Sequence, residues 1–271
     1  MRRAGMAALI LIWAAPVFSA VPISGREQHM VFAREPVQAV AAAAYREELS
    51  HQAANGMLDR DQAALKRIRR LSSRLIAQAI QLKPEASNWA WEVHITSDPQ
   101  VAAYSMGGGK LLIGIHFIDS YKLTDNELAV ALAHEIGHVI AEHVREQISL
   151  AASFNKSVPL RTRKVTDVVN AMESDISVFL RLQPLSRLQE IEADDIGIEL
   201  AARAGIPPSA AISFYSKLAQ TDNRQSIFDT HGPSVQRVKF ADSMAGYAWP
   251  IYEASRNAKF SPSYAFVTTT R

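Results

Sequence analysis

The sequence predicts an α+β fold that is mainly α-helical, with a small β-sheet or hairpin at one side. Two long stretches, residues 62–82 and 125–147, carry apolar residues at the spacing of a helix face. Residues 91–96 instead alternate between apolar and polar side chains, which is typical of a strand. With 271 residues, 48% of them hydrophobic, the chain is long enough to bury one domain core.

The composition excludes several kinds of site. The chain has 29 basic and 27 acidic residues, and the counts become equal when Arg2 and Arg3 are set aside. Without a basic stripe, we expect no nucleic-acid partner. The absence of cysteine excludes disulfides, thiol catalysis and thiolate metal sites. Any bound metal must therefore be held by histidine and carboxylate side chains.

The first 20 residues have the pattern of a secretory signal peptide. Arg2 and Arg3 precede an apolar run over residues 4–18, and the small residues Ser19 and Ala20 follow. Cleavage is expected after Ser19 or Ala20. An uncleaved anchor is the alternative, although the run is shorter than the about 20 residues of a membrane span. We therefore expect an exported, periplasmic protein, with membrane association if the segment is retained.

The next segment, residues 21–55, is predicted to be an N-terminal arm followed by a helix. Residues 21–36 show no clear period, whereas residues 38–54 are alanine-rich and favour a helix that Asn55-Gly56 ends. A second helix over 62–82 is capped by Asp59 or Asp61. Its basic face is either a membrane-contacting surface or, as we expect, a solvated one.

A hairpin is predicted before the central helix. Residues 101–106 and 110–115 flank Gly107-Gly108-Gly109, which favours a turn. An exposed edge strand here would bind an extended peptide by backbone pairing, and an ordinary core hairpin is the alternative. We expect His94 and His116, in this region, to be structural or surface residues.

The helix expected over residues 125–147 contains the most informative motif. Thr124 and Glu127 form a capping box at its start. His134 and His138 lie four residues apart on one face, as two ligands of one zinc ion would. Glu135 lies to one side, where it can take a proton from a metal-bound water. On one continuous helix His143 would point about 140° away from His138, so it is not expected to be a third ligand.

A carboxylate pair further along the chain can complete this site. A helix is expected over 165–182, and Pro184 is expected to end that stretch. A new helix then begins, with Ser186 and Gln189 as its capping box. In that new helix Glu190 and Asp194 share one face. If one carboxylate reaches the metal, Glu190 is placed to do so, and Asp194 can accept the Nδ1–H of a ligating histidine.

These motifs resemble a known peptidase family. His134-Glu135-x-x-His138, followed by Ser186-Arg187-x-x-Glu190-x-x-Ala193-Asp194, is similar to the gluzincin peptidases related to HtpX and the CAAX prenyl endopeptidase. The resemblance is strongest to soluble periplasmic quality-control members and covers about residues 56–237. Two departures are Met106 in place of a usual proline and Gly232 inserted after His231.

The resemblance implies a zincin-like fold and roles for seven residues. It implies that His134, His138 and Glu190 bind one zinc ion per chain and that Glu135 is the general base. It implies that Asp194 supports a ligand. His231 is expected near the metal, as a transition-state donor or a reversible fourth ligand, or in a structural role. Arg237 is expected to fix a loop or bind a carboxylate, or to be structural.

The remaining chain is predicted to complete this domain and end in a tail. We expect a helix over 207–220, a polar loop over 221–230 and a short helix from Pro233. The predicted division is a signal peptide at 1–20, an arm and helix at 21–55, a metallopeptidase domain at 56–245 and a tail at 246–271.

The predicted function is zinc-dependent endopeptidase activity on cell-envelope proteins, particularly misfolded or misassembled ones. Protein or peptide substrates are the expected partners, and the sequence leaves the oligomeric state open. Two alternatives stand beside this prediction. One is a zinc-containing chaperone or adaptor that binds unfolded envelope proteins without cleaving them, and the other is a helical scaffold without a metal.

Overall fold

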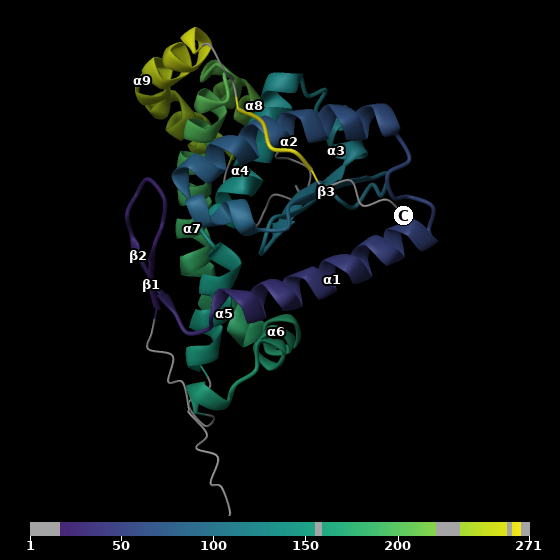
Figure 1. Ribbon diagram of the computed structural model, residues 1–271, viewed down its shortest axis with the longest axis vertical. Coiled ribbons are helices and arrows are strands. Elements are labelled where there is room, and N and C mark those ends of the chain that lie inside the picture. Colours follow the sequence, from purple (N-terminus) through teal and green to yellow (C-terminus); the bar gives the residue numbers. More distant parts are fainter. Residues whose placement is uncertain (1–16, 155–158, 221–233, 259–261, 267–271) are drawn as a thin grey trace, which may run out of the picture.

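The computed structural model describes residues 17–154, 159–220, 234–258 and 262–266. It confirms the predicted class, since 69% of the residues that it describes are helical and the sheets are small. The longest helix, α7, runs through the middle of the molecule, and α4 and α9 pack against it (Figure 1). The helices are α1 (Arg34–Ala54), α2 (Gln62–Leu82), α3 (Ile115–Ser120), α4 (Asp125–Ile140), α5 (His143–Phe154), α6 (Val165–Ser174), α7 (Ile176–Arg203), α8 (Ser209–Gln220) and α9 (Ser234–Asn257).

Helix α2 follows the sequence prediction closely. Asp61 caps it by accepting a hydrogen bond of 2.9 Å from the Ala64 amide. Its apolar face is buried, and part of its basic face has a structural use. Arg67 and Arg70 pair with Asp125, at the start of α4, at 2.6 and 2.9 Å. These two arginines therefore fasten α2 to the start of α4.

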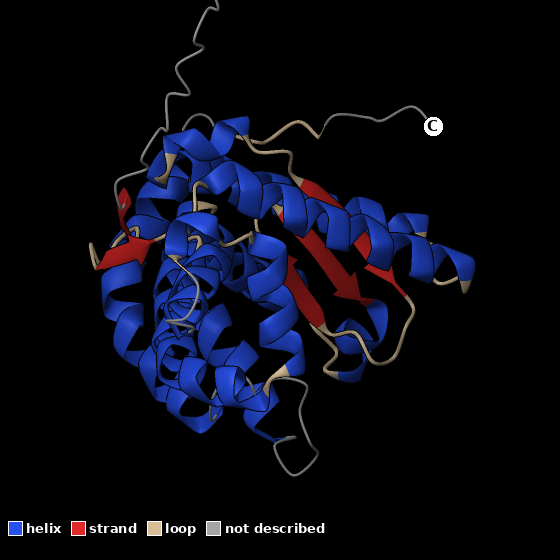
Figure 2. Ribbon diagram, turned by 90° about the horizontal axis from the view of Figure 1, so that it is seen from below, coloured by secondary structure: helices blue, strands red, loops and turns tan. Residues whose placement is uncertain are grey.

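The predicted hairpin is present within a three-stranded sheet. The central strand is β5 (Lys110–Gly114). It pairs in parallel with β3 (Glu92–Thr96) and in antiparallel with β4 (Ala103–Met106). β5 is buried throughout, whereas every residue of β4 is partly exposed. This sheet lies on one side of the helical mass, and a two-stranded hairpin lies on the other (Figure 2).

That second hairpin corrects the prediction of a loose arm over residues 21–36. β1 (Val17–Ala20) pairs antiparallel with β2 (Glu27–Met30). Val21 and Met30 are buried at 1% exposure, and the Gln28 amide donates to the carbonyl of Ala141 at 2.8 Å. Strands of four residues are too short to show a period, so tertiary contacts rather than local pattern define them.

The continuous helix predicted over 125–147 is also wrong, because it is two helices. Glu142, between α4 and α5, has a φ of 55°, a left-handed conformation that ends α4. The Glu142 carboxylate pairs with Arg34, Lys83 and Arg145 at 2.8, 2.9 and 3.0 Å. These ion pairs, two of them with residues far along the chain, support a break that carries no glycine or proline.

Pro184, conversely, does not end a helix as the sequence predicts. Asp175 caps α7, which continues through Pro184, so Ser186 is an interior residue whose hydroxyl donates to Leu182 at 3.2 Å. Helix α9 is likewise long rather than short, and it continues past Gly246 and through Pro250. Beyond it, the Tyr264 amide donates to the Ser73 carbonyl at 2.9 Å, so this part of the predicted tail packs on α2.

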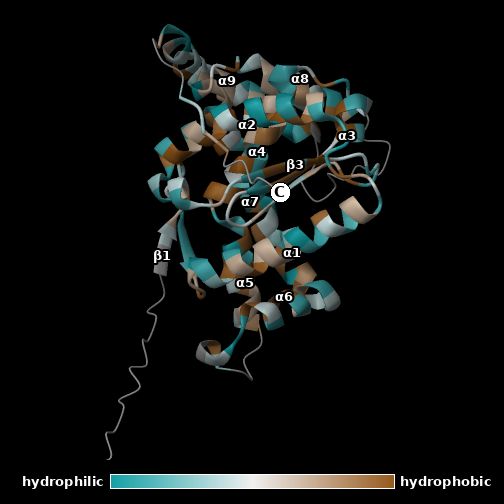
Figure 3. Cartoon of the chain, turned by 45° about the vertical axis from the view of Figure 1, so that its right-hand side comes forward, coloured by the Kyte–Doolittle hydropathy of each residue, from teal (hydrophilic) through white to brown (hydrophobic). Residues whose placement is uncertain are grey.

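The buried apolar residues form two clusters. The larger surrounds α4 and includes the sheet, with α2, α8 and the second half of α7. The smaller joins α1, α5 and α6 to the first half of α7 through Val37, Ile148, Val168 and Leu182. In Figure 3 the strand β3 shows hydrophobic colouring in the interior. Among the described residues, no helix has both the length and the apolarity needed to cross a membrane.

Candidate metal centre

Helix α4 presents His134 and His138 side by side. Their ring centroids are 4.7 Å apart, and their Nε2 atoms are 3.1 Å apart. The His134 side chain is 3% exposed and that of His138 is 15% exposed. Both Nε2 atoms therefore face one small volume that is reached from the His138 side.

Helix α7 brings Glu190 to the same volume. Its Oε2 lies 3.3 Å from His134 Nε2, and its Oε1 lies 3.3 Å from His138 Nε2. One ligand atom from each of the three residues lies within 4.8 Å of the others. Two imidazoles and one carboxylate form a donor set that zinc accepts, so the residues fit a zinc ion.

Two glycines allow α4 and α7 to approach this closely. A Cβ atom added at Gly197 would lie 2.9 Å from the backbone nitrogen of His134. One added at Gly137 would lie 3.0 Å from the carbonyl oxygen of Ala193. The two helix backbones are thus in contact next to the histidines. A side chain at either position would meet the backbone of the other helix.

A buried polar network holds the other side of His134. Asp194 Oδ1 lies 2.8 Å from His134 Nδ1, and the Tyr215 hydroxyl donates to the same oxygen at 2.6 Å. Arg237, from α9, donates from Nε to Asp194 Oδ2 at 2.8 Å. Arg237 is only 7% exposed, and its guanidinium lies 4.5 Å from the centre of the Tyr215 ring. Arg237 therefore contacts the buried carboxylate of Asp194.

The charges of this network favour a cation beside the imidazoles. Burial opposes ionisation of Asp194, but Arg237 and His134 outweigh it and hold the pKa of Asp194 below its usual range. Burial and Arg237 oppose protonation of His134, but Asp194 and Glu190 outweigh them and raise its pKa to about 9. The carboxylates therefore make this a place where positive charge is stabilised.

Glu135 directly follows His134 in α4, and its side chain contacts the sheet. It is 3% exposed, and its Oε2 accepts a hydrogen bond of 2.8 Å from the Ser105 hydroxyl on β4. This contact fixes one carboxylate oxygen. A carboxylate held next to a metal can accept and return protons.

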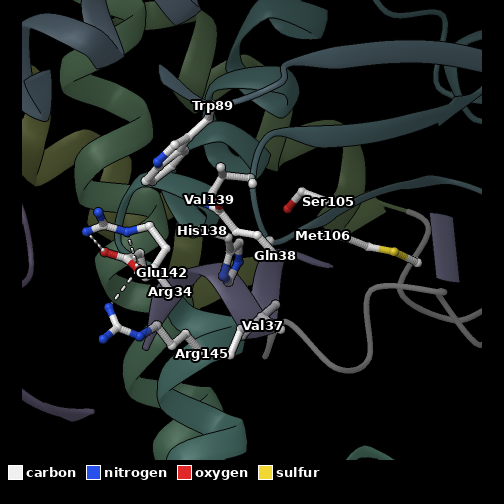
Figure 4. A pocket seen from close by; sticks show the side chains of 13 residues that line it. Arg34, Val37, Gln38, Trp89, Ser105, Met106, His138, Val139, Glu142 and Arg145 are labelled. Carbon is white, nitrogen blue, oxygen red and sulfur yellow. Dashed lines mark hydrogen bonds and ion pairs between the residues drawn. The ribbon is translucent and has the colours of Figure 1, made fainter. Parts of the chain in front are cut away.

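A small cleft opens beside His138 (Figure 4). Ser105 and Met106 lie on one side of it, and the ion pairs of Glu142 with Arg34 and Arg145 lie on the other. Val37 and Trp89 add apolar surface. The cleft therefore joins the candidate metal centre to the partly exposed strand β4.

His143 does not lie where the sequence analysis placed it. Because α5 starts a new helix, His143 turns back, and its Nδ1 lies 2.9 Å from Nδ1 of His138. It is thus next to His138, on the side of the ring away from Glu190. His231, the seventh predicted site residue, lies outside the described residues.

Sequence reasoning missed Ser105, Tyr215 and the partners of His143. Each contacts the site from an element far along the chain: Ser105 precedes Glu135 by 30 residues and Tyr215 follows Asp194 by 21. Neither distance repeats a local period, so no helical or strand pattern indicates these contacts.

Comparisons with known proteins agree with this geometry. A model of peptidase family M48 matches residues 62–245. The mitochondrial metalloendopeptidase OMA1 of Arabidopsis thaliana is 36% identical over 55% of this chain and 30% of its own length. Its Schizosaccharomyces pombe counterpart is 28% identical over 81% and 64%, and the Escherichia coli metalloprotease LoiP is 28% identical over 55% and 60%. The matches thus span from about a third to under two thirds of these relatives.

Proposed function

The chain belongs to peptidase family M48, and on that premise we propose that it is a zinc metalloendopeptidase that cleaves protein substrates. The observation that carries the proposal is the convergence of His134, His138 and Glu190 from two helices. The metalloendopeptidases and the metalloprotease to which the chain is similar support the same activity.

In this proposal His134, His138 and Glu190 hold one zinc ion per chain. When bound, zinc polarises the scissile carbonyl and lowers the pKa of a coordinated water. Asp194 accepts the Nδ1–H of His134, so the lone pair of that neutral ring lies on Nε2, the atom that would bind the metal. Arg237 and Tyr215 keep the Asp194 carboxylate in place.

Glu135 acts as the general base and then as the general acid. It takes a proton from the attacking water and returns it to the amine that leaves. The Ser105 hydroxyl bonds one of its oxygens, so the other oxygen is left to exchange the proton. For His231 we keep the proposal of a position near the metal, as a transition-state donor or a reversible fourth ligand.

The substrate is proposed to lie as an extended segment along β4, with its scissile bond at the cleft beside His138. The partial exposure of β4 and its contact with Glu135 through Ser105 support this. An extended segment must be unfolded to enter, which favours misfolded or misassembled proteins.

The compartment proposed is the cell envelope. Its support is the N-terminal sequence, in which two arginines, an apolar run and small residues follow one another as in an export signal. If this signal is cleaved after Ala20, strand β1 (Val17–Ala20) is removed with it.

The test is the substitution Glu135→Gln, which keeps the shape of the side chain and removes the base. We expect unchanged zinc content and a loss of casein hydrolysis of at least about 10²-fold. Zinc is measured by elemental analysis and hydrolysis by release of labelled fragments, with and without a chelator.

The matched control is Glu47→Gln, an exposed glutamate of α1, which should leave both readings unchanged. Full hydrolysis by Glu135→Gln would refute the assignment of the base. Zinc binding and capture of unfolded casein by the wild type, without any cleavage, would instead support the chaperone alternative.

A further inference from the structure

The two candidate histidine ligands are supported in different ways. His134 contacts a carboxylate directly, through Asp194. His138 instead contacts a second imidazole, with its Nδ1 2.9 Å from Nδ1 of His143. The rings lie 5.0 Å apart at 78° to each other, and His143 is 1% exposed. A buried histidine without a role in the proposed reaction therefore lies directly behind a candidate ligand.

The positions of the nitrogens determine which atoms carry hydrogens. His138 Nε2 faces His134 and Glu190, so a metal bound there leaves the hydrogen of the neutral ring on Nδ1. The Nδ1 of His143 must then accept this hydrogen, and the hydrogen of His143 lies on Nε2. That Nε2 is buried and makes no hydrogen bond of good geometry among the described residues, and Glu192 Oε2 lies 3.3 Å from it.

Glu192 is in turn held by an arginine from the start of the chain. Arg26 Nε and Nη2 donate to the two Glu192 oxygens at 2.6 and 2.9 Å. The same guanidinium donates to both oxygens of Glu146 at 2.6 and 2.8 Å. Two-point contacts of this kind fix the plane of a carboxylate. Arg26 directly precedes β2 and lies outside the residues that the family model matches.

We propose that Arg26, Glu192 and His143 form a chain of positioning residues that orients His138 as a metal ligand. This inference depends on the proposed function in one respect, which is that His138 is a metal ligand. It adds that the N-terminal segment before β2 is part of the metal centre. Helix α7 then supplies a support for each imidazole: Asp194 acts on His134 directly, and Glu192 acts on His138 through His143.

His143 is not itself a third imidazole ligand in this arrangement. Its Nδ1 meets the Nδ1 side of His138, whereas Glu190 meets the Nε2 side of the same ring. The effect of His143 on the metal must therefore pass through the orientation and basicity of His138. Loss of such a supporting contact typically weakens metal binding about 10- to 100-fold.

The test measures metal binding rather than hydrolysis. Zinc affinity is measured by competition with a chromophoric chelator, and ligand geometry by the visible absorption of the cobalt-substituted protein. We expect His143→Ala to weaken zinc binding about 10- to 100-fold and to change the cobalt spectrum. His143→Gln, which can still accept from His138 and donate to Glu192, should restore most of both. His116→Ala, at an exposed histidine, is the control and should change neither.

A folded His143→Ala protein with wild-type zinc affinity and cobalt spectrum would overturn the proposal. If that variant fails to fold, Arg26→Ala gives the same two readings, since its side chain is 26% exposed. Weaker zinc binding there supports the chain of residues, and unchanged binding removes Arg26 and the N-terminal segment from it. A wild type that binds zinc but cleaves nothing would refute the proposed activity while leaving this inference in place.

Discussion

Glu142 shows how a single residue can shape the approach to the metal centre. Its left-handed backbone ends α4, and its side chain is 5% exposed among three basic side chains. Burial opposes its ionisation, but Arg34 and Lys83 outweigh burial and lower the pKa of Glu142 to about 2. The ionised form is therefore part of the folded structure at neutral pH.

Glu142→Gln should destabilise the protein by about 3 kcal/mol at pH 7, because it leaves buried cations without their partner. The pKa is depressed, so this contribution is present above the unfolded value near 4.5 and disappears as the pH falls toward 2. The difference between wild type and variant should thus shrink below pH 4.5. This difference in the free energy of unfolding is measured by guanidinium unfolding of the two metal-free proteins at several pH values. A difference that is the same at every pH would contradict this account.

At the scale of single residues, the sequence predicts contacts between residues of one helix. It does not predict contacts between residues that lie far apart in the chain. The four-residue spacings of His134 with His138, and of Glu190 with Asp194, are local properties of a helix. The structure places these four side chains together. Arg26 lies 166 residues before Glu192, and no local pattern records a contact between them.

At the scale of elements, the site depends on how closely α4 and α7 pack. The sequence predicts α2, α8, the hairpin and the start of α4, where caps, turns and periods agree. It fails at Glu142 and Pro184 because contacts outside the helix decide both. At Glu142 ion pairs support a break, and at Pro184 the burial of Val178 and Leu182 in the smaller cluster offsets the missing hydrogen bond.

Gly197→Ala should push the two helices apart, because the added methyl group would lie 2.9 Å from the His134 nitrogen. We expect a destabilisation of about 1–3 kcal/mol together with weaker zinc binding, as Glu190 moves away from the histidines. Thermal unfolding and chelator competition measure the two effects.

The control is Gly246→Ala in α9, where an added Cβ would meet nothing within 4 Å. This change should be neutral or stabilising by up to about 1 kcal/mol, since alanine favours helix. Equal zinc affinity in the Gly197 and Gly246 variants would show that the close helix contact is not required.

At the scale of the whole molecule, the candidate metal centre joins six elements of the chain. The candidate ligands come from α4 and α7, and their supports come from the N-terminal hairpin, α5, α8 and α9. Ligands that folding brings together link metal binding to stability, because the unfolded chain does not hold them in place.

Removal of zinc should therefore lower Tm. At a free zinc concentration 100 times Kd, binding contributes about 2.7 kcal/mol, or roughly 5–10 °C for a chain of this size. Differential scanning fluorimetry after chelation, and again after zinc or magnesium is added back, measures the shift. Zinc should restore Tm and magnesium should not, and a Tm that is indifferent to zinc would count against a folded metal centre.

Helix α7 is a single element shared by two apolar clusters of unequal size, with Pro184 and its missing backbone donor between them. The N-terminal half of α7, which packs with α5 and α6, belongs to the smaller cluster and so has less buried apolar surface. Local unfolding would therefore begin in this half and extend toward the C-terminal end of α7. Amide hydrogens of residues 176–186 would then exchange with solvent sooner than those of residues 194–202. Glu190, a candidate metal ligand, lies between these two stretches, where the less stable part of α7 meets the more stable part.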